Sequence, residues 1–294
     1  MYLVTGATGG LGRRIVRLLR SRDLSVRAFV RLTSHFAELE NRDAEIFIGD
    51  LQRSQDIEKA CRGIRCIISA HGSSEGSGGA ANVDYRANVE LIDAAKAANV
   101  EHFVFISVLG SDRGYEDAPI FKAKAAVEKY LQASGLPYTI LRPSGFASNL
   151  LPLAERFRQT GVYLLIGDPQ NRSSIVSTDD LARIAVDAPS IHSAHNKIFA
   201  VGGPEILKRE DIPHIFGHVF NREPFIINPP LLAFDGLRGM LGVFNRDLNT
   251  SLGTLRALLA NEFFCPPEAV TNLELTFGFR LETLEHFLRR YLGV

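Results

Sequence analysis

The sequence predicts a doubly wound α/β fold, in which helices cover both faces of a parallel sheet. Short apolar runs typical of buried strands alternate with segments whose apolar residues recur at helical spacing. The first apolar run ends in the turn GATGGLG, a connection typical of a strand followed by a helix. The alternation weakens after Pro143, so we expect a sheet domain over residues 1–150 and a smaller, mostly helical lobe over 151–294.

The elements of the sheet domain follow from this alternation in chain order. Six apolar runs rich in Val, Ile and Phe predict strands over residues 2–5, 25–31, 44–50, 65–72, 102–110 and 138–143. Helical spacing predicts helices that begin near Leu11, at an N-cap Ser54, and over residues 83–98 and 118–134. Such strands with crossover helices between them predict a parallel sheet. The glycine- and serine-rich stretch 72–81 predicts a mobile loop.

The second lobe has fewer signals. Helices are expected over residues 150–159 and from the region 177–180, where Ser177 or Thr178 is a typical N-cap. The apolar run 197–203 is expected to rejoin the sheet, which would make the lobe interleaved rather than independent, and the end after Arg209 is expected to be mainly helical. The apolar segment 228–244 is either a buried connection or a lid or docking face.

Composition excludes several classes of protein. Thirty-three basic and thirty-three acidic residues give a net charge of zero, so no global charge favours nucleic acid. No apolar run approaches the ~18 residues of a membrane span. The start MYLVTGATGG leaves no room for a signal peptide before the first strand, which predicts a cytoplasmic protein, or a stromal one in a plastid-bearing source. Three cysteines lack zinc spacing and make a disulfide framework unexpected.

The glycine-rich turn predicts a phosphate site. Gly6, Gly9 and Gly12 form a G-x-x-G-x-x-G pattern between a strand and a helix, where backbone N–H groups can approach a pyrophosphate at the positive helix end. The residues expected to contact the cofactor here are Gly6, Thr8, Gly9, Gly10, Leu11, Gly12 and Arg13. The alternative is a glycine-rich turn that binds nothing.

The end of the second strand indicates which dinucleotide binds. NAD-preferring proteins place Asp or Glu there, roughly 20 residues past the glycines, whereas this chain has Arg31. A guanidinium matches a phosphate, so Arg31, with Arg13, predicts NADP(H); the alternative is a surface charge without a contact. The other expected cofactor contacts are Asp50 and Leu51 near the adenine, and Ala70, Lys124 and Pro143 further along the sheet. The segment RPSGF that leaves the sixth strand at Pro143 is expected to pass the nicotinamide.

These motifs in this order resemble the atypical, extended branch of the short-chain dehydrogenases/reductases, within it the NmrA-like group. The matching pieces are VTGATGGLG, AFVR, GDLQ, ANVDYRANVELIDAAKAANVEHFVFISVLG, KAAVEKYLQASGLPYTILRPSGF, SIVSTDDLA and IFAVGGPE. The resemblance implies a Rossmann fold and a bound nicotinamide cofactor. It does not fix the reaction, because similar sequences include 8-vinyl reductases, isoflavone reductase-like enzymes, quinone reductases, redox sensors and photosystem assembly factors.

The usual catalytic tyrosine of that superfamily is absent. Lys124 and Glu128 match the family pattern K-x-x-x-E, which places Ile120 at the tyrosine position. The resemblance to isoflavone reductase-like proteins implies that Lys124 acts as acid or base, or else only binds the nicotinamide ribose. Ser107 matches the substrate-orienting serine or is a plain strand-end hydroxyl. His71 is expected where a loop passes the cofactor, either as a proton donor or as a structural histidine, and Tyr85 and Tyr115 are other phenols that sequence cannot place.

Two functions remain open. The first is an NADPH-dependent reductase of a small or flat apolar substrate, such as a quinone, an enone or a vinyl group. The second is a non-catalytic NADP-binding redox sensor or assembly factor that docks on a protein through the C-terminal lobe. The pairs His192/His195 and His214/His218 lack a third ligand, so no metal site is predicted.

Overall fold

The structure is a computed structural model. It describes residues 1–72, 79–115, 118–232, 235–236 and 246–294, without the side chains of 246–251. The loop expected over 72–81 and the apolar segment 228–244 fall mostly outside the described residues.

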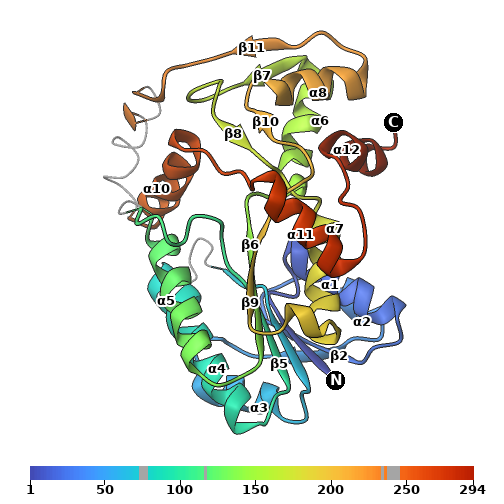
Figure 1. Ribbon diagram of the computed structural model, residues 1–294, viewed down its shortest axis with the longest axis vertical. Helices are drawn as coiled ribbons and strands as arrows, with labels where there is room; N and C mark the ends of the chain where they lie inside the picture. Colours follow the sequence, from blue (N-terminus) through green and yellow to red (C-terminus); the bar gives the residue numbers. More distant parts are fainter. Residues whose placement is uncertain (73–78, 116–117, 233–234, 237–245) are drawn as a thin grey trace.

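Seven parallel strands form the central sheet in the order β3-β2-β1-β4-β5-β6-β9 (Figure 1). Their bounds are β1 (Tyr2–Thr5), β2 (Val26–Val30), β3 (Glu45–Ile48), β4 (Cys66–Ser69), β5 (His102–Ile106), β6 (Tyr138–Pro143) and β9 (Lys197–Val201). The chain starts near the middle of the sheet and builds outward in both directions. The predicted doubly wound fold is confirmed.

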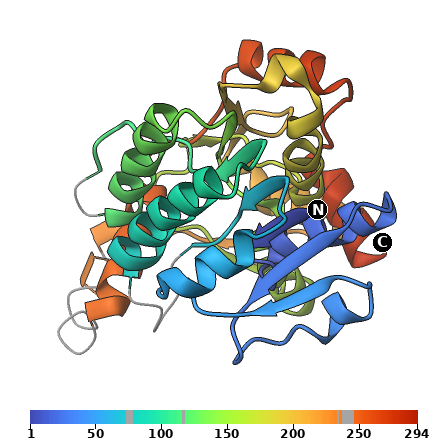
Figure 2. The same cartoon turned by 90° about the horizontal axis from the view of Figure 1, so that it is seen from below.

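Helices cover both faces of this sheet. The helices α3 (Ser54–Cys61), α4 (Ala87–Ala97) and α5 (Pro119–Ala133) lie side by side on one face in Figures 1 and 2. The other face carries α1 (Gly10–Ser21), α7 (Thr178–Asp187) and α11 (Pro267–Phe277). Successive strand residues point to opposite faces, so Leu3 packs under α3 and α4 while Val4 packs under α1 and α7.

Three boundaries differ from the sequence prediction. The residue before α3 is Arg53, and Ser54 is its first residue rather than its N-cap. The helix expected from residue 83 begins earlier, as the π-helix η1 (Ala80–Arg86) that runs into α4. β5 ends at Ile106, although the N–H groups of Ser107 and Leu109 still donate to carbonyls of β6 before the chain turns at Gly110, whose φ is +86°. The short helix α2 (Ala37–Glu40) has no apolar periodicity long enough to predict it.

The second half of the chain contributes to the sheet and also builds the smaller lobe. β9 pairs parallel with β6, and Ser177 caps α7 by accepting from the N–H of Asp180. The remaining helical elements are η2 (Ala147–Leu150), α6 (Leu151–Thr160), η3 (Ala188–Ser190), η4 (His192–Ala194), α8 (Asp211–Phe220), α10 (Arg246–Ala260) and α12 (Leu284–Leu292). Four short strands were not predicted: β7 (Val162–Leu164), β8 (Arg172–Ser173), β10 (Leu207–Lys208) and β11 (Phe225–Ile227).

The lobe has its own core. Phe157 of α6, Phe216 of α8 and Phe287 of α12 are fully buried together. β7 pairs parallel with β11, and β8 pairs antiparallel with β10. No helix in the described part of the chain is both long and apolar enough to span a bilayer.

Candidate functional site

The turn between β1 and α1 requires glycine at two positions. Gly6 has a φ of +69°, and a Cβ there would lie 2.6 Å from the carbonyl oxygen of Ala70. A Cβ on Gly12 would lie 2.0 Å from the carbonyl oxygen of Gly6, so only glycine lets α1 pack this close to the turn. No side chain caps the N-terminus of α1, and its first turn contains no acidic residue. The backbone N–H groups there suit a pyrophosphate.

A groove of about 270 Å³ opens above this turn. It lies at the carboxyl ends of β1, β2, β3 and β4, where parallel sheets bind ligands. Seven of the predicted cofactor contacts line it: Gly6, Thr8, Gly9, Arg31, Asp50, Leu51 and Ala70. Gly10, Leu11, Gly12, Arg13, Lys124 and Pro143 do not line it. The side chain of Leu11 packs into the core, which leaves only its backbone for a ligand.

The two arginines predicted to share a phosphate differ in their surroundings. Arg31 lines the groove, and its guanidinium has no partner among the described residues. Arg13 instead donates to the Thr8 carbonyl at 2.9 Å, the Glu38 carboxylate at 2.8 Å and the His35 carbonyl at 2.8 Å. Arg13 thus ties the phosphate loop to the loop after β2. The sequence could not indicate this, because Glu38 lies 25 positions away.

Lys124 is buried under the carboxyl ends of β4 and β5. Its ammonium donates to the carbonyls of His71 at 3.2 Å and Ile106 at 3.1 Å, and lies 3.5 Å from a carboxylate oxygen of Asp84. The ring of Phe105 lies 4.9 Å away. Burial lowers the pKa of Lys124, and the charge of Asp84 opposes that shift. Sequence reasoning missed Asp84, which is fully buried in η1.

His71 is held as a neutral ring. Its Nδ1 accepts from the Thr5 hydroxyl at 2.8 Å, and its Nε2 donates to the Val83 carbonyl at 3.2 Å. Burial lowers the pKa of His71 to about 3, and the nearby charge of Lys124 adds to the effect. His71 lines the groove. Because its ring is neutral at neutral pH, it has no acidic proton to donate to a substrate.

Ser107 belongs to a buried network around Glu128. The Ser107 and Ser111 hydroxyls both donate to this carboxylate, the latter at 3.0 Å. Arg142 donates to it through Nε at 3.0 Å and Nη2 at 2.5 Å, and also to Asp112 at 2.8 Å. The family-like K-x-x-x-E spacing thus places an anchor for β5 and β6 one helical turn from Lys124.

The other candidate proton donors lie elsewhere. Ile120 is a partly buried aliphatic residue against the cluster of Leu109 and Phe121. Tyr85 is exposed, and the Tyr115 ring packs edge-on against Phe121 at 4.9 Å.

The histidine pairs show packing contacts. The His192 and His195 rings lie 5.4 Å apart, and His195 lies 4.5 Å from the buried ring of His102. His214 and His218 are both exposed on α8. Within the described residues no group of three or more metal-ligating side chains occurs.

A second, apolar cavity of about 510 Å³ begins where β6 ends. Ser144, Gly145 and Phe146 form one wall, and leucines of α6 and α10 form others. Along the carboxyl edge of the sheet, the groove, Lys124 and this cavity therefore follow one another from β3 to β6. A dinucleotide laid along this edge from the groove would extend its far end toward Lys124 and the cavity.

Comparison with known proteins agrees with this geometry. A family profile described as NAD(P)H-binding matches residues 6–190. The chain belongs to this NAD(P)H-binding family. The NAD(P)H-binding family that the sequence resemblance implied is thus confirmed.

Proteins similar to this chain include an assembly factor and reductases. The photosystem II assembly factor Ycf39 of Cyanophora paradoxa is 30% identical over 270 residues, which cover 89% of this chain and 82% of that protein. An NAD(P)H azoreductase of Xenophilus azovorans is 30% identical over 215 residues, 72% of this chain and 71% of that protein. An NADPH-dependent quinone oxidoreductase of Escherichia coli, solved with NADPH, has the same fold with a TM-score of 0.79, 20% identity, and coverage of 99% of this chain and 100% of that one.

Proposed function

We propose that this NAD(P)H-binding protein is an NADPH-dependent reductase of a small or flat apolar substrate, such as a quinone, an enone or a vinyl group. The observation that carries the proposal is the succession of groove, buried lysine and apolar cavity along one edge of the sheet. When bound, the cofactor supplies a hydride. The cavity's mostly aliphatic and aromatic walls suit a flat apolar molecule.

The preference for the phosphorylated cofactor rests on Arg31. Arg31 lines the groove at the end of β2, together with Ser34. No carboxylate follows β2 where a ribose 2′-hydroxyl would be bound. Arg13 supports this site indirectly, since it holds Thr8 and the loop after β2 in place.

The proton of the reaction needs a source other than a tyrosine, because Ile120 stands in that position. Lys124 is the nearest candidate, since burial lowers its pKa and makes release of a proton easier than from an exposed lysine. Its ammonium donates to two carbonyls and lies 3.5 Å from a carboxylate oxygen of Asp84. Lys124 would have to exchange one of these contacts in order to reach a ribose hydroxyl or the substrate.

The test is NADPH consumption by the purified protein with quinones, enones and vinyl tetrapyrroles. We expect stoichiometric oxidation with at least one class, and a loss of at least tenfold in turnover per folded molecule in Lys124→Met, measured at a temperature where the variant is still folded. Lys122→Met, an exposed lysine of the same helix, serves as the control and should leave turnover unchanged. Absence of NADPH oxidation with all three classes would overturn the reductase proposal.

A second candidate is a non-catalytic NADP-binding redox sensor or assembly factor. It is favoured by the internal contacts that occupy Lys124 and by an apolar strand face in the smaller lobe. That face consists of Val162, Leu164, Phe225 and Ile227, which are 37%, 56%, 65% and 44% exposed. Because Val162 pairs with Phe225 and Leu164 with Ile227, these side chains form one patch that could dock on a protein partner. This candidate predicts tight NADPH binding without turnover, and different affinity for a partner with oxidised and reduced cofactor.

A further inference from the structure

The charged side chains that line the apolar cavity are all positive. Its described lining includes three arginines, Arg156, Arg172 and Arg209, and no Asp, Glu or Lys. A site for a wholly neutral apolar ligand has no need of guanidinium groups, which are costly to desolvate. The inference below deepens the proposed function and rests on it, since it concerns the substrate class of the same cavity.

One of the three arginines is already neutralised. Arg172 donates through Nε and Nη2 to both carboxylate oxygens of Glu262, at 2.7 Å and 2.9 Å. Its guanidinium also lies 4.2 Å from the centre of the Phe264 ring. Arg172 therefore contributes packing to the cavity wall and little net charge.

Arg209 is different, because its charge is half-buried without an ion pair among the described residues. Its Nη1 donates to the Ile166 carbonyl at 3.0 Å, and its Nη2 donates to the Leu258 carbonyl. Two of its five N–H groups are thus used, and the other three have no partner among the residues that the structure describes. Burial lowers the pKa of Arg209, which shows the cost of its desolvation.

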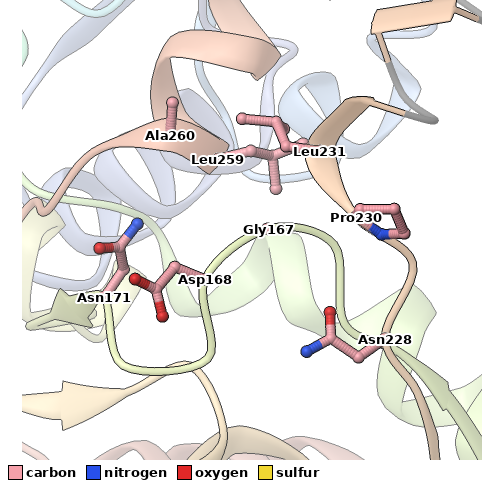
Figure 3. A pocket seen from close by; sticks show the side chains of 8 residues that line it. All are labelled: Gly167, Asp168, Asn171, Asn228, Pro230, Leu231, Leu259 and Ala260. Carbon is pink, nitrogen blue, oxygen red and sulfur yellow. The ribbon is translucent and has the colours of Figure 1, made fainter.

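The Tyr163 phenol, which also lines the cavity, and then Asp168 oppose the lowering of the Arg209 pKa. Asp168 forms no ion pair with Arg209 in the described part of the chain. Figure 3 shows Asp168 and Asn171 on the loop to one side of Gly167, with Asn228 and Pro230 on the other side, around an opening that shares Leu259 with the apolar cavity. The Asp168 carboxylate accepts from the N–H of Gln170, and Asp168 does not line the apolar cavity.

Arg156 provides a second guanidinium at the edge of the cavity. It is exposed on α6, and its side chain has no hydrogen-bonding or ionic partner in the described part of the chain. Its neighbour Arg158, by contrast, pairs with Glu155 on the same helix and does not line the cavity.

We propose that the cavity is built for apolar, aromatic substrates that carry a carboxylate, with Arg209 as the inner contact of the anion and Arg156 as the outer one. The free N–H groups of Arg209 can bind a carboxylate in place of water, and the leucines and Phe263 enclose the rings. Both arginines are specificity residues in this scheme. Neither takes part in hydride or proton transfer.

The test is equilibrium binding by calorimetry of two matched probes, anthraquinone-2-carboxylate and its neutral 2-hydroxymethyl analogue, without cofactor. We expect the carboxylate to bind about tenfold more tightly or better. Arg209→Gln should reduce that preference below about threefold while the neutral probe binds as before, and Arg156→Gln should give a smaller loss. Arg158→Gln is the matched control on the same helix and should retain the full preference.

Two outcomes would overturn the inference: equal binding of both probes by the wild type, or a preference that survives in Arg209→Gln and in Arg156→Gln alike. Arg209→Lys retains the charge and should keep part of the preference, which separates a lost anion contact from a lost fold. The reductase proposal fails separately. Arginine-dependent binding of the acid without NADPH oxidation would contradict only the reaction, whereas oxidation of NADPH by neutral quinones without any preference for acids would contradict only the substrate class.

Discussion

At the residue scale, side chains of the same type have different roles because their contacts differ, as two arginines near the phosphate loop show. Arg13 and Arg31 were both predicted to bind the cofactor phosphate, yet Arg13 does not line the groove and donates to two carbonyls and to Glu38. Arg31 lines the groove, and its guanidinium has no partner among the described residues. Selectivity for the 2′-phosphate should therefore depend on Arg31, and the shape of the loop on Arg13.

Replacement of Arg31 tests this division. Arg31→Ala should weaken NADPH binding by about 1–3 kcal/mol and leave NADH binding within about twofold, because only the phosphate contact is lost. Fluorescence titration with both cofactors measures the ratio. Arg53→Ala, an exposed arginine outside the groove, is the control. An unchanged NADPH to NADH ratio in Arg31→Ala would show that the phosphate is bound elsewhere.

Asp84 and Lys124 form a buried ion pair whose halves depend on one another. Asp84 is fully buried and Lys124 is 5% exposed, so removal of either breaks an ion pair inside the protein. Asp84→Asn and Lys124→Met should each lower the free energy of unfolding by about 3–5 kcal/mol. The double variant should lose less than the sum. Urea unfolding of the four proteins measures this, and simple additivity would argue against the pairing.

At the element scale, a polar network attaches the C-terminal helix α12 to the start of α7. Arg290 donates to Glu282 and Asp179, and Asp179 also accepts from Arg14 of α1 at 3.0 Å. The carboxylate of Asp180 accepts from the backbone N–H of Glu282 at 2.7 Å. Burial raises the pKa of Asp180 to about 6, and the charges of Glu282 and Asp179 add to this effect.

This raised pKa predicts a specific pH dependence. Between about pH 4 and pH 6 the folded state holds a proton on Asp180 that the unfolded state has lost, so the contribution of Asp180 to stability falls as the pH rises through this window. Asp180→Asn removes that fall and should stabilise the protein by about 1 kcal/mol at pH 8, a value discounted for partial exposure. Asp179→Asn, which breaks the pairs with Arg14 and Arg290, should destabilise it.

Chemical unfolding at pH 4.5 and pH 8 measures the free energy of unfolding of the Asp180→Asn and Asp179→Asn variants under the same conditions. The expected result is opposite signs for Asp180→Asn and Asp179→Asn at pH 8. Destabilisation of Asp180→Asn at pH 8 would mean that its carboxylate acts in the network as an ordinary charged partner.

Elements were predictable from sequence where the pattern is long and local. The alternation of strands and helices up to Pro143 is confirmed because each element contains its own apolar period. β7 and β11 were missed because each has three residues, and Val162 meets its partner Phe225 from far along the chain. The same limit applies to the site. The glycine turn and Arg31 could be located from local motifs, but the contacts of Lys124 with Asp84 depend on how η1 packs against α5.

At the scale of the whole molecule, the two halves of the chain share one core. The cluster beneath α1 combines Val4 of β1 with Ile184 of α7, Phe199 of β9 and Phe277 of α11. The seventh strand of the sheet also comes from the second half, since β9 pairs along β6 from Thr139 to Pro143. A boundary at residue 150 therefore separates the sheet region from the lobe in the sequence but cuts through the hydrophobic core.

This shared core predicts that the chain unfolds as one unit. Residues 1–150 alone would expose the apolar residues of β6 and of the α1 face, and we expect this fragment to bind no NADPH and to lack a cooperative thermal transition. The full chain should show a single transition. NADPH at about 100 times its dissociation constant should stabilise the whole chain by about 2.7 kcal/mol, because binding to the folded state alone pulls the entire equilibrium. Calorimetry with and without NADPH measures the number of unfolding transitions and the shift of each. Two transitions, of which NADPH shifts only one, would mean that the sheet and the smaller lobe fold separately despite their common core.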